Sequence, residues 1–167
     1  FARALRSLLR HDPDVLVIGE IRDLDSLDIA VKASLTGHLV FSTLHTNDAV
    51  SVVTRLTDMG MPPHLVGATL HLAVAQRLVR RLCAHCRRPV ELGAGDARAL
   101  GVPDSAGATV WEPRGCLYCA GRGFDGRMGL FEMAFIDHEA GSLISRGADE
   151  ATLAAALREK GFRTLRA

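Results

Sequence analysis

Two short segments of the chain carry polar side chains directly after runs of apolar residues. In VLVIGEIRD (residues 15–23), four apolar residues and a glycine lead into Glu20. Such a run predicts a buried central strand that delivers one carboxylate to the open end of a parallel sheet, where these sheets bind ligands. In TGHLVFSTLHTN (residues 36–47), a second apolar run precedes Thr43 and His45. Two neighbouring strands are therefore expected to direct polar groups toward one cleft.

Four cysteines form two CxxC pairs further along the chain. Cys83 and Cys86 make the first pair, and Cys116 and Cys119 make the second, with twenty-nine residues between the pairs. Each pair can place two thiolates on one metal ion through a tight turn, and two pairs complete a tetrahedral site without an open position. Two disulfides are the alternative, but they need an oxidising compartment, and nothing in the sequence indicates export. The spacing predicts a structural zinc site.

The predicted metal is expected to hold the cysteine-bearing segment together. Residues 83–130 are rich in glycine and poor in large apolar side chains. Zinc contributes about 10–16 kcal/mol to the folding of small zinc peptides, whereas a typical whole domain is stable by about 5–15 kcal/mol. We therefore expect residues 83–130 to form a separate, loop-rich unit that depends on zinc for its shape.

Composition limits the size of the core and the kinds of partner. The chain has 167 residues, of which 48% are hydrophobic, and a formal net charge of +1. This suffices for one ordinary core or one and a half small ones, and the charge alone predicts neither a nucleic-acid partner nor an acidic substrate. The most apolar long stretch, residues 61–82, contains two histidines, a glutamine and arginines. No transmembrane helix is predicted.

The expected elements around the first two motifs form a βαβ unit. Hydrophobic periodicity predicts their type, and acidic residues and glycine mark their ends. The predicted elements are a helix over residues 1–11, a strand over 14–18, a helix after an Asp25 N-cap, a strand over 38–43, and a helix from Asp48 to Gly60.

A long helix is expected next, because apolar residues recur at helical spacing up to residue 82 and Pro62-Pro63 suits a helix start. After the cysteine-rich unit, residues 128–137 predict a strand. Residues 139–146 and 149–161 predict two short helices, with Gly161 ending the second. These expectations divide the chain into residues 1–82, 83–130 and 131–167.

The block GEIRD together with TGHLVFSTLHTN closely resembles the Walker B region and histidine box of the hexameric ATPases of type II secretion and type IV pilus assembly. The resemblance implies an α/β fold, namely the C-terminal part of a RecA-like P-loop NTPase core, followed by a small zinc-binding subdomain and short helices. In that family a tetracysteine insert follows the stretch AQRLVRRLC in secretion and pilus-extension motors and is missing from retraction motors. The cysteines therefore favour assembly of a pilus or pseudopilus, with a slight lean toward the secretion branch.

The same resemblance implies roles for individual residues. Glu20 corresponds to the Walker B carboxylate, which supports Mg²⁺ and the attacking water when ATP is hydrolysed. His45 corresponds to the residue that senses or contacts the γ-phosphate, with Thr43 and His38 shaping the same strand. His38 stands at the start of that strand, which favours a structural role. For Arg22, a structural pair with a neighbouring carboxylate and a role in nucleotide sensing are both open.

Other parts of a nucleotide site are missing from the chain. The sequence contains no GxxxxGK[ST] phosphate loop, and the acidic box of the resembled family is also absent. The chain begins at Phe1 without a leader and is expected to be the interior of a longer protein, truncated at its C-terminal end as well. Alone, it should bind ATP poorly and should not hydrolyse it.

The resemblance also implies partners for the complete protein. It would form a homo-hexamer in the cytoplasm and reach the inner membrane through a platform protein and a cytoplasmic anchor protein, without direct membrane insertion. Two other hypotheses are a non-enzymatic zinc-ribbon adaptor and a nucleic-acid-binding zinc protein. Arginines crowd around the cysteines, but aromatic residues that would stack on bases are scarce. We therefore expect no nucleic-acid partner.

Overall fold

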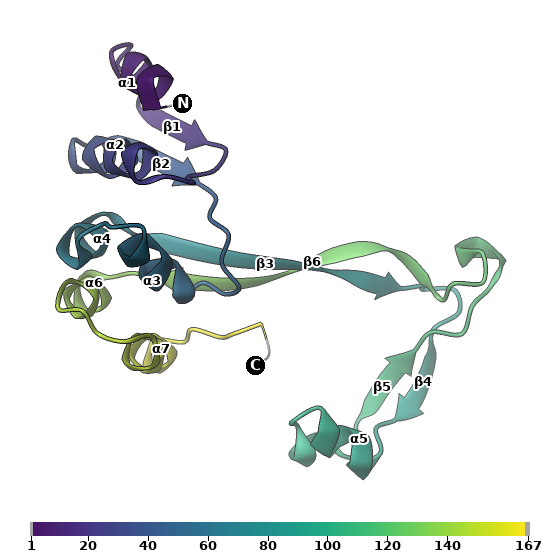
Figure 1. Cartoon of the computed structure of the whole chain (residues 1–167). Helices are drawn as coiled ribbons and strands as arrows, with labels where there is room; N and C mark the ends of the chain where they lie inside the picture. The colour runs from purple at the N-terminus through teal and green to yellow at the C-terminus, as the bar shows by residue number, and fades with distance from the viewer. Residues whose placement is uncertain (1, 166–167) are drawn as a thin grey trace. The chain divides into compact units, whose positions relative to one another are not determined.

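The structure is a computed structural model that describes residues 2–165. It contains two compact units, the first formed by residues 1–76 and 131–167 and the second by residues 77–130. Two long strands, β3 (Leu72–Leu82) and β6 (Phe124–Phe135), contribute residues to both units. These strands are hydrogen-bonded neighbours, and their arrows point in opposite directions in Figure 1.

The first unit begins with the predicted βαβ arrangement (Figure 1). Strands β1 and β2 are parallel neighbours, with Val17 opposite Phe41. The crossover helix between them supplies the apolar residues that cover one face of this two-stranded sheet. The elements are α1 (Ala2–Leu9), β1 (Val15–Ile18), α2 (Leu24–Leu35) and β2 (Leu39–Ser42).

The N-cap of helix α2 lies two residues before the predicted one. The carboxylate of Asp23 accepts a hydrogen bond of 2.8 Å from the backbone N–H of Ser26, so Asp23 is the N-cap and the assignment to Asp25 is wrong. Asp25 lies in the first turn, where a negative charge is still favoured by the helix dipole. Gly37 has a φ of +98° just after the helix, a conformation that suits glycine.

The prediction of a buried central strand for residues 15–18 holds for one face of β1 and is wrong for the other. Leu16 and Ile18 are buried, but Val17 is 79% exposed. Successive side chains of a strand point to opposite faces, so one face of the β1–β2 pair packs on the core and the other is apolar and exposed. This exposed apolar face consists of Val15, Val17, Leu39 and Phe41.

Two short helices follow β2. Helix α3 (Ser51–Asp58) has Val50 as its N-cap, without a side-chain cap. The carboxylate of Asp48, the predicted cap, lies two residues earlier and accepts a 2.8 Å hydrogen bond from the N–H of Ser51. Gly60 follows the helix with a φ of +100°, which confirms the predicted stop. Helix α4 (Pro63–Thr69) then begins with a proline at its first position.

The long helix expected up to residue 82 is wrong, because the chain leaves the helical conformation at Leu70 and continues as β3. Helical spacing of apolar residues predicted the helix, but pairing with β6 satisfies the backbone of this segment instead. The N–H of Ile136, just after β6, donates a 2.9 Å hydrogen bond to the carbonyl of His71, just before β3. Pairing with β6, which is distant in the sequence, therefore determines the structure of this segment more strongly than the helical spacing of its apolar residues.

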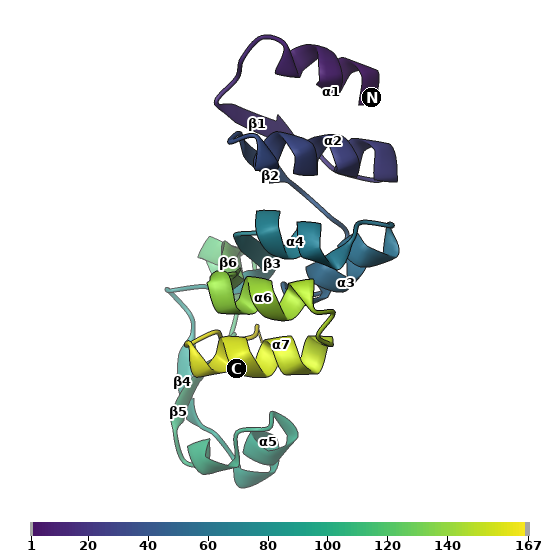
Figure 2. The ribbon, with the colours of Figure 1, turned by 90° about the vertical axis from the view of Figure 1, so that its left-hand side faces the viewer.

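The strand and two helices predicted at the C-terminal end are confirmed. β6 is followed by α6 (His138–Ser145) and α7 (Glu150–Glu159), and Gly161 has a φ of +91°. The carboxylates of Asp137 and Asp149 cap these helices by accepting backbone N–H bonds of 3.0 and 2.7 Å. Figure 2 shows α3, α4, α6 and α7 lying side by side.

Helices α4 and α6 cross at two glycines. A Cβ atom on Gly67 would lie 2.3 Å from the carbonyl oxygen of Gly141, and a Cβ on Gly141 would lie 2.6 Å from the carbonyl oxygen of Gly67. Real Cβ atoms do not approach other atoms this closely. The two helix backbones therefore touch only because both positions lack a side chain.

The second unit contains more regular structure than its composition indicated. Strands β4 (Arg88–Glu91) and β5 (Thr109–Glu112) pair antiparallel, with Val90 opposite Val110. Helix α5 (Ala94–Ala99) lies in the connection between them, where the sequence predicted only loop. Two short 3₁₀ turns, Pro103–Ser105 and Leu117–Cys119, complete the unit.

Candidate functional sites

Glu20 and His45 meet at the carboxyl ends of β1 and β2. The Nε2 atom of His45 lies 3.0 Å from a carboxylate oxygen of Glu20, within hydrogen-bond distance. Glu20 follows β1 by two positions and His45 follows β2 by three. Because parallel strands end at the same edge of a sheet, residues far apart in sequence come together there.

Thr43 links the two strand ends. Its hydroxyl donates a 2.6 Å hydrogen bond to the carbonyl of Gly19, and its own carbonyl accepts a 3.2 Å bond from the N–H of Ile21. The backbone on either side of Glu20 is thereby attached to the strand that carries His45. These bonds fix the backbone near Glu20 and His45, although the Glu20 side chain is partly exposed and that of His45 is largely exposed.

Arg22 forms an ion pair with the oxygen of Glu20 that His45 does not contact. This guanidinium is the main cause that holds the pKa of Glu20 below its ordinary value; partial desolvation opposes it, and the His45 ring adds to the lowering. Glu20 is therefore a carboxylate at neutral pH, with each oxygen facing a different nitrogen group. Arg22 belongs to the cluster that the sequence placed at this strand end.

His38 lies apart from this cluster. It precedes the first residue of β2, whereas Thr43 and His45 follow the last. Its Nδ1 atom is 3.0 Å from the carbonyl of Ala33 and 3.1 Å from the hydroxyl of Thr36, both at the C-terminal end of α2. These contacts place His38 in the turn that connects α2 to β2.

The four cysteines of the second unit converge on one point. The sulfur atoms of Cys83 and Cys116 are 3.9 Å apart, those of Cys86 and Cys119 are also 3.9 Å apart, and all four lie within 4.8 Å of one another. Four sulfurs bound tetrahedrally to zinc at about 2.3 Å would be separated by about 3.8 Å. The cluster is therefore consistent with a zinc site.

Backbone N–H groups point at the cysteine sulfurs. Gly115 donates to Cys86 at 3.3 Å, and Cys116 and Gly123 donate to Cys119 at 3.2 Å each. Burial would raise the pKa of Cys119, but the two N–H donors and the neighbouring side chains of Cys116 and Cys86 together outweigh it and lower the pKa to about 6. Burial raises the pKa of Cys86 to about 11. Four neighbouring thiolates repel one another, so this donor set suits a cation that holds all four deprotonated.

Aromatic and arginine side chains surround the cysteines in a way that the sequence did not predict. The rings of His85 and Tyr118, one from each CxxC turn, stack with centroids 4.2 Å apart. The guanidinium of Arg87 lies over the ring of Trp111 at 4.5 Å. Only the folded arrangement of the two turns reveals these contacts, because the partners lie more than twenty residues apart in the sequence.

Comparison with known proteins assigns this chain to a protein family. A family model described as "Type II/IV secretion system protein" matches residues 1–167. The chain belongs to this family. The family resemblance read from the sequence is confirmed, and the four-cysteine cluster accompanies it.

Relatives come from both secretion and pilus systems. The chain is 48% identical over 153 residues to the type II secretion system protein E of Klebsiella pneumoniae, covering 92% of the chain and 30% of that protein. It is 48% identical over 171 residues to the type IV pilus assembly ATPase PilB of Myxococcus xanthus, covering 99% of the chain and 30% of that protein. The chain thus spans about a third of the length of these relatives.

Solved structures confirm the predicted α/β fold class. The pilus retraction motor PilT with bound ADP matches with a TM-score of 0.64 at 24% identity, covering 96% of this chain and 36% of that one. The Legionella pneumophila ATPase DotB matches with a TM-score of 0.58 at 22% identity, covering 95% and 33%. Separately, none of the helices in residues 2–165 combines the length and apolar character that crossing a bilayer requires.

Proposed function

We propose that this chain is the part of a secretion or pilus-assembly ATPase that carries the Walker B carboxylate, the γ-phosphate sensor and a zinc-stabilised unit. The observation that supports this most directly is the 3.0 Å contact between Glu20 and His45 at the ends of two parallel strands. In this proposal ATP hydrolysis by the complete protein powers the assembly of a pseudopilus or pilus. The relatives named for type II secretion and pilus assembly support both branches.

In the proposed mechanism Glu20 acts as a carboxylate that supports Mg²⁺ and orients the attacking water. Its lowered pKa keeps it ionised at neutral pH, as this role requires. His45 has two possible partners, the carboxylate of Glu20 and the γ-phosphate. When the ring turns to the phosphate, one oxygen of Glu20 is released, while Arg22 still holds the other. Loss of the γ-phosphate would restore the contact between His45 and Glu20, which gives the site two states.

The remaining parts of the nucleotide site lie outside these residues. The chain carries no phosphate loop, so the amides and lysine that hold the phosphates must come from elsewhere in the full-length protein. Thr43 contributes by fixing the backbone beside Glu20. We propose no nucleotide contact for His38, whose ring is bonded to the end of α2.

Zinc is the ion that the cysteine cluster would hold, through Cys83, Cys86, Cys116 and Cys119. Four thiolate ligands leave no position for substrate, so the bound metal would be structural. Its contribution would be to fix the two CxxC turns relative to each other, and the backbone N–H groups aimed at the sulfurs would orient the ligands.

The proposal includes the partners of the complete protein. It would act as a homo-hexamer with ATP bound between neighbouring subunits, at the cytoplasmic side of the inner membrane. A platform protein and a cytoplasmic anchor protein would connect it to the membrane. Membership of the type II/IV secretion system family supports this part of the proposal.

ATP hydrolysis by the full-length protein tests the proposal. Glu20→Gln should lower the steady-state rate by about 10²–10⁴-fold under saturating Mg²⁺, because the carboxylate acts on the attacking water, while nucleotide binding is retained. Glu159→Gln is the matched control, since this exposed carboxylate lies near the end of α7. Equal rates for wild type and Glu20→Gln would contradict the motor and favour a non-enzymatic zinc adaptor.

A further inference from the structure

Glu132 is a buried carboxyl residue in the first unit. It is 2% exposed and lies on the face of β6 that also buries Ala134, while Phe131 and Met133 on the opposite face are exposed. A strand that places its glutamate inside and its phenylalanine outside reverses the usual preference. Such a residue needs polar partners, because an isolated buried carboxylate is costly.

Two backbone N–H groups supply these partners. One oxygen of Glu132 accepts a 2.7 Å hydrogen bond from the N–H of Ala49, which is itself buried. The other oxygen accepts a 3.0 Å bond from the N–H of Leu165. The donors lie 83 and 33 residues away along the chain. Each oxygen of Glu132 thus holds a different backbone N–H group, so Glu132 joins two distant segments of backbone.

The first of these segments is the loop that carries His45. Ala49 follows His45 by four positions, and within the loop the hydroxyl of Thr46 donates a 3.1 Å hydrogen bond to the carbonyl of Asp48. At the other end, Thr43 is attached to the carbonyl of Gly19. The His45 loop is therefore held on one side by β1 and on the other by Glu132.

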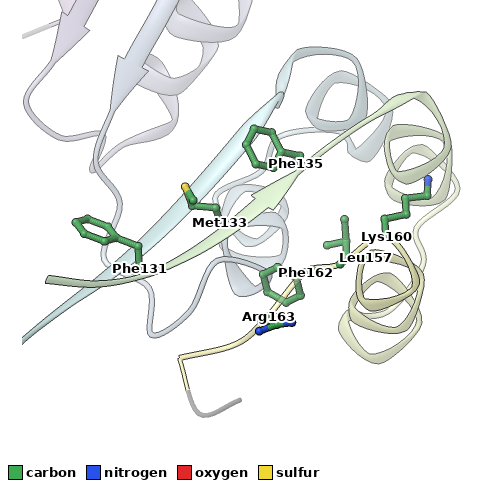
Figure 3. Close-up of a pocket in the computed structure, with 8 residues that line it drawn as sticks. Phe131, Met133, Phe135, Leu157, Lys160, Phe162 and Arg163 are labelled. Atoms are coloured by element: carbon green, nitrogen blue, oxygen red, sulfur yellow. The ribbon is translucent and has the colours of Figure 1, made fainter.

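The second segment follows α7. Figure 3 shows Phe162 and Arg163 on this segment, which runs beside β6, and a cavity of about 330 Å³ is lined by residues of both. Phe162 is buried, so apolar packing anchors the start of the segment. Further along, Leu165 is attached to Glu132.

We propose that Glu132 is a positioning residue that sets the location of the His45 loop and couples it to the segment after α7. This inference rests on the proposed role of His45 at the γ-phosphate. One carboxylate serves both segments, so displacement of the segment after α7 would leave one oxygen of Glu132 without its donor and shift the side chain that holds Ala49. Movement of the segment after α7 therefore changes the position of the His45 loop, and movement of the loop changes the position of that segment.

The first test is the ratio of the dissociation constants for ADP and ATP in the full-length protein. Glu132→Gln offers one acceptor oxygen and one NH₂ donor, so one of the two N–H groups loses its acceptor. We expect the preference for ATP to fall by about tenfold, the factor that corresponds to the loss of one buried hydrogen bond. His45→Ala should lower it similarly, and the double variant should lose no more than His45→Ala alone.

Ile144→Val is the control for a general loss of stability. Ile144 is a buried residue of α6, and its shortening should lower Tm without changing the ratio of the dissociation constants. If Glu132→Gln changes the ratio no more than Ile144→Val does, then Glu132 has a purely structural role and the proposal is wrong.

The second test examines the coupling through Leu165. Leu165→Pro removes the N–H donor and leaves Glu132 intact. We expect faster hydrogen exchange at the amide of Ala49 and in residues 44–50; unchanged exchange there would overturn the coupling. This measurement needs no turnover, so it is informative even if Glu20→Gln shows that the chain is not part of an ATPase.

Discussion

The two units of this chain are stabilised in different ways. The first contains a continuous cluster of buried apolar side chains drawn from its helices and strands, including Leu27, Val66, Ile144 and Leu153. In the second unit, residues 77–130, which the structure describes throughout, the buried apolar residues are Cys83, Leu92, Ala97 and Cys119. Half of these are cysteines, so the sulfur cluster occupies the place of a hydrophobic core.

The difference shows how composition and stability are related within one chain. The first unit can fold by removing apolar surface from water. The second has little buried apolar surface, and we expect it to depend on the ion that its thiolates would bind. The two units should therefore respond differently to chelators, to core substitutions and to pH.

Metal removal should have the largest effect and should act on the second unit alone. A strong chelator, or Cys116→Ser, is expected to unfold residues 77–130, because zinc contributes about 10–16 kcal/mol in small zinc peptides. Hydrogen exchange followed by peptide mapping would show protection lost there and retained in α2, α6 and α7.

His85→Ala is the control for this experiment. It lies in the same CxxC turn as Cys83 and Cys86 and loses only its stack on Tyr118, so metal content should not change. Loss of protection in α2 and α6 in step with metal release would show that the two units are not independent.

A change at the crossing of α4 and α6 should give the next largest effect, confined to the first unit. Gly67→Ala forces a Cβ against the carbonyl of Gly141, and overpacking of this kind costs about 1–3 kcal/mol or more. Thermal unfolding should begin at a lower temperature, with the zinc content unchanged.

Gly95→Ala is the matched control. Gly95 lies in α5, and a Cβ there would meet no atom within 4 Å. The same substitution should therefore stabilise α5 by about 0.5–1 kcal/mol, because alanine favours helix more than glycine does. A destabilising Gly95→Ala would contradict the assignment of α5 as a helix.

The helix caps should give the smallest effect and a pH dependence that belongs to the first unit. The Thr152 N–H holds the pKa of Asp149 below its ordinary value, and the Ala140 N–H does the same for Asp137. A lowered folded-state pKa contributes stability above the unfolded pKa that is lost as pH falls through the folded pKa. Asp149→Ala should thus lower Tm at pH 7 by less than Gly67→Ala does. The difference in Tm between Asp149→Ala and wild type should become smaller at acidic pH. A difference in Tm that does not change with pH would contradict the role of the Asp149 charge.

Much of the fold and of both sites follows from the sequence, for reasons that particular residues make clear. Glu20 and His45 were predictable because strands that alternate with a helix end at one edge of a sheet. The cysteines were predictable because a CxxC turn presents two sulfurs together. The strand at β3 was not predictable, since its apolar residues fit helical spacing and its pairing partner, β6, lies some fifty residues away.

Glu132 shows a second reason why part of the structure could not be predicted from the sequence. Alternation in β6 gives two faces, and the larger apolar residues, Phe131, Met133 and Phe135, share the face opposite to Glu132. Burial of the apolar face would be the natural expectation, yet the structure buries Glu132 and Ala134. The deciding contacts are the N–H groups of Ala49 and Leu165, which no local pattern connects to this strand.

The exposed apolar face of β1 and β2 has a practical consequence for work with the isolated chain. The two strands carry a contiguous apolar surface, formed by Val15, Val17, Leu39 and Phe41. Exposed apolar surfaces on strands promote aggregation. A preparation of these residues alone is expected to precipitate as protein concentration rises. The substitutions Val17→Lys and Phe41→Lys should improve yield and solubility. They place charges on the exposed apolar face and leave the buried face of the strands unchanged.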